Sequence, residues 1–318
     1  MSMPFYVSPE QAMRDKDDYA RKGVARSRSS VVVQYAGGIL MVTPNLSSVL
    51  HKISELYDRI AFAAVGRYNE YENLRKAGVT YADVTGYQFD RSDVTGRGIA
   101  NWYAQTLGTI FSEPTGKPYE VEIVVAEVGL QPDSDQIYRI TWDGLVSDEP
   151  GFVAFGGQAD QVSAALKERF HDGMSLTEAL AAALAALAAP NANAQGSGPG
   201  SSAGNGQQGE LTASQLEVAI LDRARAHRTF RRLLGPRLEE LLTESRATTP
   251  APADADSGSA GSGSGSAGSG SGPGDADAGS SAPSAPSAPS APSAPPDEPP
   301  TGPSAAGGDG IPRPPAGN

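Results

Sequence analysis

The sequence predicts an α+β fold arranged as a four-layer αββα sandwich, with a disordered C-terminal tail. Several segments are almost continuously apolar and rich in β-branched residues, which is typical of strands buried on both faces. The helical segments fall into two groups along the chain, so each group can cover one side of two packed sheets. The last aromatic residue is Phe230, and from about residue 243 onward Ser, Ala, Gly, Pro and Asp dominate.

The first element expected is a helix over residues 9–22. Ser8 can cap its start, Pro9 suits the first helical position, and Gly23 is a natural stop. Gln11 completes a capping box with Ser8. Few apolar residues stand among many charged ones, so this helix is expected to lie against a neighbour rather than inside a core.

The remaining elements follow from apolar runs, turn residues and capping signals. Strands are expected at residues 29–35, 39–43, 60–65, 119–128, 136–141, 152–155 and 216–221. Helices are expected at residues 67–87, 94–112, 159–170, 175–189 and 227–242, the last with a bend at Gly235-Pro236.

The foldable part of the chain is expected to span residues 8–243, with a flexible loop at residues 190–213. Residues 244–318 form the Ser/Ala/Gly/Pro-rich tail. Such a composition buries too little apolar surface to offset an ordering entropy of about 1–2 kcal/mol per residue. The sequence therefore predicts one substantial core and a solvated extension.

Composition excludes several kinds of function. A net charge of −12 argues against a nucleic-acid binder. The chain has no cysteine, and its three histidines, His51, His171 and His227, lack zinc-site spacing, so no metal and no cofactor are expected. Without a long apolar run or a signal-peptide pattern, the protein is expected to have no membrane partner and to be cytoplasmic.

Several short motifs in a fixed order resemble the proteasome family, in particular the α-type subunits of actinobacteria. They are SPEQAM at 8–13, ARKG at 20–23, YAGG at 35–38, KISELYDR at 52–59, DVTGR at 93–97, YAQTLGTIF at 103–111 and PYEVE at 118–122. The resemblance covers about residues 2–243. It implies an N-terminal-nucleophile hydrolase fold and a heptameric ring of α subunits stacked on β-type subunits that carry the peptidase sites.

The resemblance also predicts that this chain has no catalytic residue. A proteasome nucleophile is a threonine that begins the first strand and uses its own amine as base. The matching position here is Arg28, and the supporting acidic position falls near Pro44. Two alternatives stay open: a self-processed N-terminal-nucleophile amidohydrolase beginning at Ser29 or Ser30, and a free-standing binding module with a disordered tail.

What the resemblance implies instead is a gate and docking subunit. Lys52 matches the family's catalytic lysine position, and in α-type subunits it resembles a docking residue for the C-terminal carboxylate of a ring-shaped AAA ATPase. Gly23 would let that ATPase tail approach closely, and Lys22 would add positive charge nearby. Unfolded proteins would be the substrates of the whole complex. The gate would consist of the first seven residues: Met1, Ser2, Met3, Pro4, Phe5, Tyr6 and Val7.

Overall fold

The computed structural model describes residues 8–194 and 211–248 of the 318-residue chain. All of them belong to one compact unit. The expected gate at residues 1–7, most of the expected loop at 190–213 and most of the expected tail at 244–318 lie outside the described residues.

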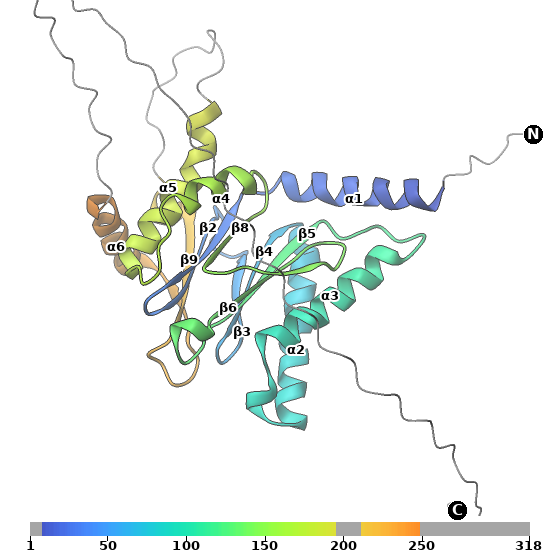
Figure 1. Cartoon of the computed structure of the whole chain (residues 1–318), viewed down its shortest axis with the longest axis horizontal. Coiled ribbons are helices and arrows are strands. Elements are labelled where there is room, and N and C mark those ends of the chain that lie inside the picture. The colour runs from blue at the N-terminus through green and yellow to red at the C-terminus, as the bar shows by residue number, and fades with distance from the viewer. Residues whose placement is uncertain (1–7, 195–210, 249–318) are drawn as a thin grey trace, which may run out of the picture. The chain divides into compact units, whose positions relative to one another are not determined.

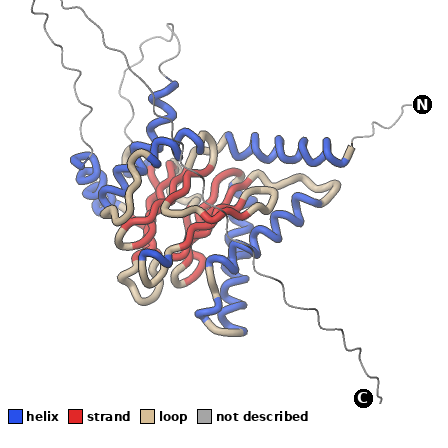
Figure 2. The backbone as a smooth tube through the Cα atoms, viewed as in Figure 1, coloured by secondary structure: helices blue, strands red, loops and turns tan. Residues whose placement is uncertain are grey.

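Two five-stranded antiparallel sheets form the centre of the described fold (Figures 1 and 2). The first sheet has the order β10-β9-β2-β1-β8, with β1 at Ser30–Tyr35, β2 at Gly38–Pro44, β8 at Phe152–Phe155, β9 at Leu216–Asp222 and β10 at Phe230–Leu233. The second has the order β3-β4-β5-β6-β7, with β3 at Ile53–Tyr57, β4 at Ile60–Gly66, β5 at Val121–Glu127, β6 at Gln136–Ile140 and β7 at Val146–Asp148.

Helices cover the outer face of each sheet, which gives the predicted αββα order (Figure 2). The first sheet is covered by α4 (Ala159–Lys167), α5 (Leu176–Ala194) and α6 (Gly235–Thr248). The second is covered by α2 (Tyr68–Gln88) and α3 (Gly96–Ser112). The predicted fold class of the folded part is confirmed.

The packing explains why the strands are apolar along their whole length. In β2, Ile39 and Met41 point into the core between the two sheets, while Leu40 and Val42 point toward the outer helices. Because successive side chains of a strand point to opposite faces, a sheet covered on both sides needs apolar residues at every position.

Helix α1 (Pro9–Ala25) extends from the sandwich and buries few of its side chains (Figure 1). The Ser8 side chain accepts a hydrogen bond from the Gln11 amide at 3.3 Å, as predicted. The Gln11 side chain does not complete the predicted capping box, because its Nε2 donates to Asp15 at 2.7 Å. Lys16 and Asp17 are among the residues that tie the helix to the sandwich. Lys16 Nζ donates to the Phe111 carbonyl at 3.2 Å, and Trp142 Nε1 donates to Asp17 at 3.0 Å. Most of the other residues of α1 are exposed.

The secondary structure differs from the sequence prediction in several places. Helix α1 does not stop at Gly23 as predicted but continues to Ala25. Strands β3 and β7 were not expected, because both are short and only partly apolar. The helix predicted over residues 227–242 was wrong in its first half: Phe230–Leu233 pairs with β9, and the helix starts only at Gly235. Helix α5 also continues past Pro190, where the prediction ended it.

Candidate functional site

The head of β1 is where a proteasome-type nucleophile would stand. Arg28, the residue predicted at that position, is exposed and lies two residues before β1 begins. The two nearest hydroxyls are already engaged: Ser29 Oγ donates to the Gly157 carbonyl at 2.9 Å, and Ser30 Oγ donates to Thr43 Oγ1 at 2.7 Å. A guanidinium is not a nucleophile, and a serine within the chain has no free amine to act as its base.

Lys52 lies at the same end of the fold, directly before β3. Its side chain is half-buried, and its Nζ donates to the Pro44 carbonyl at the end of β2, at 3.1 Å. Burial lowers the pKa of the Lys52 ammonium, Glu217 opposes this, and Arg28 lowers it further. Lys52 therefore presents a partly desolvated cation close to the head of β1.

The loop that leads to Lys52 is held by its own side chains. Asn45 Oδ1 accepts from the Ser47 amide at 3.0 Å, and Asn45 Nδ2 donates to the Leu50 carbonyl at 2.8 Å. Ser47 Oγ accepts from the Leu50 amide at 3.0 Å. Such Asx- and Ser-based turns fix a loop without a core. This one leaves three apolar side chains exposed next to Lys52, namely Leu46, Val49 and Leu50.

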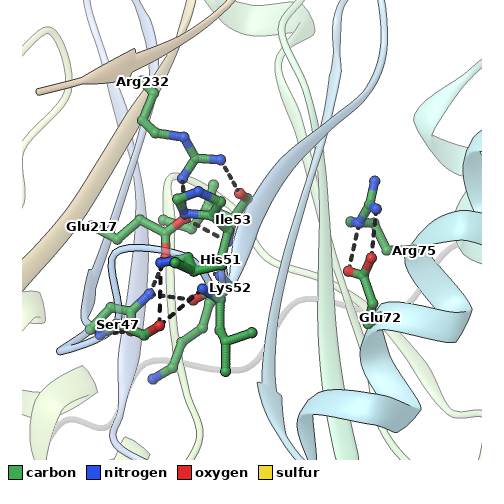
Figure 3. Close-up of polar contacts among 11 residues, drawn as sticks. Ser47, His51, Lys52, Ile53, Glu72, Arg75, Glu217 and Arg232 are labelled. Atoms are coloured by element: carbon green, nitrogen blue, oxygen red, sulfur yellow. Dashed lines mark hydrogen bonds and ion pairs between the residues drawn. The ribbon is translucent and has the colours of Figure 1, made fainter.

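A buried carboxylate, Glu217 of β9, joins this loop to both sheets (Figure 3). Its Oε2 accepts from the Lys52 amide at 3.0 Å and from Asn45 Nδ2 at 2.8 Å. Its Oε1 accepts from the Ile53 amide at 3.2 Å and from Arg232 of β10. Arg232 also donates to the Ile53 carbonyl at 2.8 Å.

Sequence reasoning missed Glu217 and Arg232. The sequence did carry a signal for Glu217, because it is the one charged residue in the predicted strand 216–221. Glutamate is almost never buried without a partner, so its position in that strand indicates a paired carboxylate. Which partner it has could not be read, because Arg232 was placed in a predicted helix.

Helix α1 carries the other two predicted docking residues. A Cβ added to Gly23 would lie 2.3 Å from Glu120 Oε2 and 2.6 Å from Glu120 Cβ, so the helix backbone packs directly on this glutamate. The close approach that Gly23 allows is therefore to its own chain. Lys22 is exposed. A contact of Gly23 or Lys22 with an ATPase tail stays a prediction.

An ion-pair cluster surrounds Glu120 under α1. Lys117 Nζ lies 2.8 Å from Glu120 Oε1 and 2.7 Å from Glu70 Oε1, and it also faces the Tyr19 ring at 5.6 Å. Burial raises the pKa of Glu120, but Lys117 and then Arg67 outweigh it, so the pKa is lowered overall. The cluster thus joins Tyr19 of α1 to Glu70 of α2 and to the segment that precedes β5.

Two classes of site have no candidate in the described part of the chain. Its His, Asp and Glu side chains form no group of three or more that could hold a metal ion. None of its helices is long and apolar enough to cross a membrane.

Comparison with known proteins gives the family. The proteasome subunit family matches residues 24–201. The chain belongs to the proteasome family. Among its relatives, a proteasome subunit alpha from Thermomonospora curvata is 64% identical over 244 residues, which covers 77% of this chain and 99% of the relative. The proteasome subunit alpha of Thermobifida fusca is 62% identical over 245 residues, which covers 77% of this chain and 92% of the relative. The proteasome subunit alpha of Streptomyces scabiei is 58% identical over 252 residues, which covers 79% of this chain and 96% of the relative.

These relatives identify an α-type proteasome subunit, a component of the α ring that assembles with other proteasome subunits. The predicted resemblance is thereby confirmed at the level of family and subunit type.

Proposed function

We propose that this α subunit is a non-catalytic gate and docking component of a 20S proteasome core in the cytoplasm. In this proposal β-type subunits carry the threonine peptidase sites, and seven copies of this chain form each outer ring. The observation that carries the proposal is the half-buried Lys52 ammonium beside a strand head occupied by Arg28. That arrangement supports binding of an anion and does not support nucleophilic attack.

The docking part of the proposal rests on the chemistry of Lys52. A terminal carboxylate that reached this ammonium would form a charge-assisted hydrogen bond in a partly desolvated place. Such a bond contributes more than an exposed ion pair, whose median value is about 0–1 kcal/mol. The exposed apolar side chains of the 45–51 loop offer contact area for the residues that precede the carboxylate. The partner proposed is the C-terminal tail of a ring-shaped AAA ATPase that delivers unfolded proteins.

The gating part concerns Met1–Val7, which precede the capped start of α1. A short apolar segment on each of seven copies would close a pore by packing at the ring axis and would cost little to displace. The anchoring of α1 through Lys16 and Asp17 supplies a fixed base for such a segment.

The docking test uses barrels assembled by co-expression with the β-type partner. Peptide hydrolysis is measured with and without the ATPase, and stimulation is expressed relative to each barrel's own basal rate. Lys52→Ala should lose the stimulation. Lys76→Ala, which removes an exposed lysine of α2, should keep it. Stimulation retained by the Lys52→Ala barrel would exclude the docking role.

Two further measurements test the gating role and the absence of a self-processed nucleophile. Deletion of residues 1–7 should raise basal peptide hydrolysis of the barrel, and an unchanged rate would exclude the gate. Intact mass of the purified chain should show no mature form beginning at Ser29 or Ser30. Such a form would favour a self-processed amidohydrolase, and a chain that stays monomeric beside the β-type partner would favour a free-standing binding module.

A further inference from the structure

We propose that Glu217 is a positioning residue for Lys52: it holds the backbone at Lys52 and Ile53 so that the ammonium meets an incoming terminal carboxylate. This inference rests on the docking function proposed above. It concerns a residue on a different strand, 165 positions away in the sequence.

The contacts of Glu217 converge on the segment that presents Lys52 (Figure 3). Its two oxygens accept from the amides of Lys52 and Ile53, at 3.0 and 3.2 Å. They also accept from Asn45 Nδ2, at 2.8 Å, and from Arg232. The donors thus come from the 45–52 segment, β3 and β10. A single carboxylate therefore fixes the start of β3 against the first sheet.

The geometry requires a carboxylate in particular. Every group that contacts the two oxygens in these four bonds is a donor, and an ionised carboxylate is an acceptor at both oxygens. A glutamine of the same shape must turn its NH₂ toward some of these donors. Either the Lys52 amide or the Ile53 amide would then lose its partner, and the segment that carries Lys52 would shift.

The negative charge of Glu217 also acts on Lys52, in addition to the hydrogen bonds that hold the backbone at Lys52 and Ile53. Glu217 is 5% exposed, so its negative charge acts on nearby cations with little screening by solvent. It opposes the effects of burial and of Arg28 on the Lys52 pKa, and thus favours the charged ammonium that a carboxylate needs. Among the described residues, two other charged or titratable groups contact the carboxylate. They are Arg232 and His51, whose Nδ1 is 3.3 Å from Glu217 Oε1.

The test compares Glu217→Gln with Glu72→Gln in the assembled barrel. Glu72 is a matched control, because its carboxylate also accepts from an arginine, Arg75, at 2.7 and 2.8 Å, but it lies on α2 away from Lys52 (Figure 3). The ATPase is titrated, and both the half-activating concentration and the maximal stimulation are measured. Positioning predicts that Glu217→Gln raises the half-activating concentration about tenfold, about 1.4 kcal/mol of docking free energy, with the maximum reached at saturation. Glu72→Gln should leave both values and the basal rate unchanged.

A purely structural role would give a different result. If Glu217→Gln lowers the maximal stimulation at an unchanged half-activating concentration, or changes neither value, the positioning role is wrong. If the variant does not assemble, Asn45→Ala replaces it, since this removes one donor to Glu217 and leaves the other three. Because Asn45 also bonds within its loop, it is compared with Ser47→Ala, which removes loop bonds to Val49 and Leu50 but none to Glu217. Asn45→Ala should raise the half-activating concentration about threefold, and no change would again overturn the inference. Stimulation that survives Lys52→Ala would instead refute the docking function itself.

Discussion

Replacing Lys117 with methionine should weaken the attachment of α1 to the sandwich. The Lys117 ammonium lies between two nearly buried carboxylates, those of Glu70 and Glu120, and methionine keeps most of its length without its charge. Gly23 of α1 packs on the Glu120 side chain, so any movement of this glutamate displaces the helix. The substitution therefore tests whether this ion cluster sets the position of the helix that precedes the proposed docking site.

The expected cost follows from the distances. Lys117 Nζ is 2.7 Å from one Oε1 atom and 2.8 Å from the other, so these oxygens are at most about 5.5 Å apart. Two negative charges at about 5.5 Å repel by about 3 kcal/mol at an effective dielectric constant of about 20. Arg67 lies 3.7–3.8 Å from both carboxylates and is about half exposed, so it offsets part of this. The net loss in the free energy of unfolding should be about 2 kcal/mol.

The loss should depend on pH, and its sign can be worked out. In the native chain the pKa of Glu120 is lowered, so its stabilising effect is present above the unfolded-state pKa and fades as pH falls through the folded-state pKa. In Lys117→Met the two carboxylates repel, which raises the pKa of one of them. That repulsion is complete at high pH and is relieved by protonation. The deficit relative to the native chain should therefore be largest near pH 8 and shrink as pH falls toward about 5.

Urea unfolding of the full chain at several pH values measures the loss in the free energy of unfolding and its dependence on pH. Lys76→Met is the control, because Lys76 is 66% exposed and lies 3.6 Å from Glu72 in an i,i+4 pair, whereas Lys117 is 39% exposed. Such a helix pair contributes only about 0.3–0.5 kcal/mol. Equal losses for the two variants, or a loss for Lys117→Met that does not change with pH, would refute the electrostatic reasoning.

The remaining predictions concern glycine packing and a buried ion pair. Gly78→Ala should destabilise the chain by about 1–3 kcal/mol despite its better helix propensity, because the new Cβ would lie 1.9 Å from Tyr103 Oη. Gly108→Ala should instead stabilise it by about 0.5–1 kcal/mol, since the nearest atom is 3.6 Å away. Asp135→Ala should cost about 3–5 kcal/mol, because it leaves Arg223, now paired at 2.7 Å and 13% exposed, without its carboxylate. Urea midpoints check all three, and a stabilising Gly78→Ala, a destabilising Gly108→Ala or a loss below about 1 kcal/mol for Asp135→Ala would contradict them.

The sequence predicted the fold where each strand is apolar on both faces. Gly38–Pro44 and Ile60–Gly66 are buried almost throughout, so their pattern was unambiguous. Ile53–Tyr57 and Phe230–Leu233 mix buried with partly or fully exposed residues, and each is the edge strand of its sheet. Such short edge strands carry a weak pattern, and their pairing is set by neighbours that are distant in the sequence.

The candidate site was predictable only in part for the same reason. Lys52 was found through its place in a family motif, and the structure shows that it is half-buried. Glu217 and Arg232 could not be connected to it, because their contacts with Ile53 require the first sheet to be stacked against the second. Gly23 was predicted to allow close approach of an ATPase tail, and that contact stays a prediction. The group that packs on Gly23 within the chain is Glu120.

Hydrolysis by Ser29 or Ser30 and binding of a carboxylate by Lys52 would need different hydrogen-bond donors to be available. For hydrolysis, Ser29 or Ser30 would need a free amine and would have to give up a hydrogen bond to Gly157 or Thr43, each worth about 1 kcal/mol. For binding, Lys52 needs only unused N–H groups. An ammonium has three donors, and the contacts in the described residues assign one of them, to the Pro44 carbonyl. A carboxylate can therefore be accepted without breaking any bond of the fold, whereas a nucleophile can be produced only by cutting the chain.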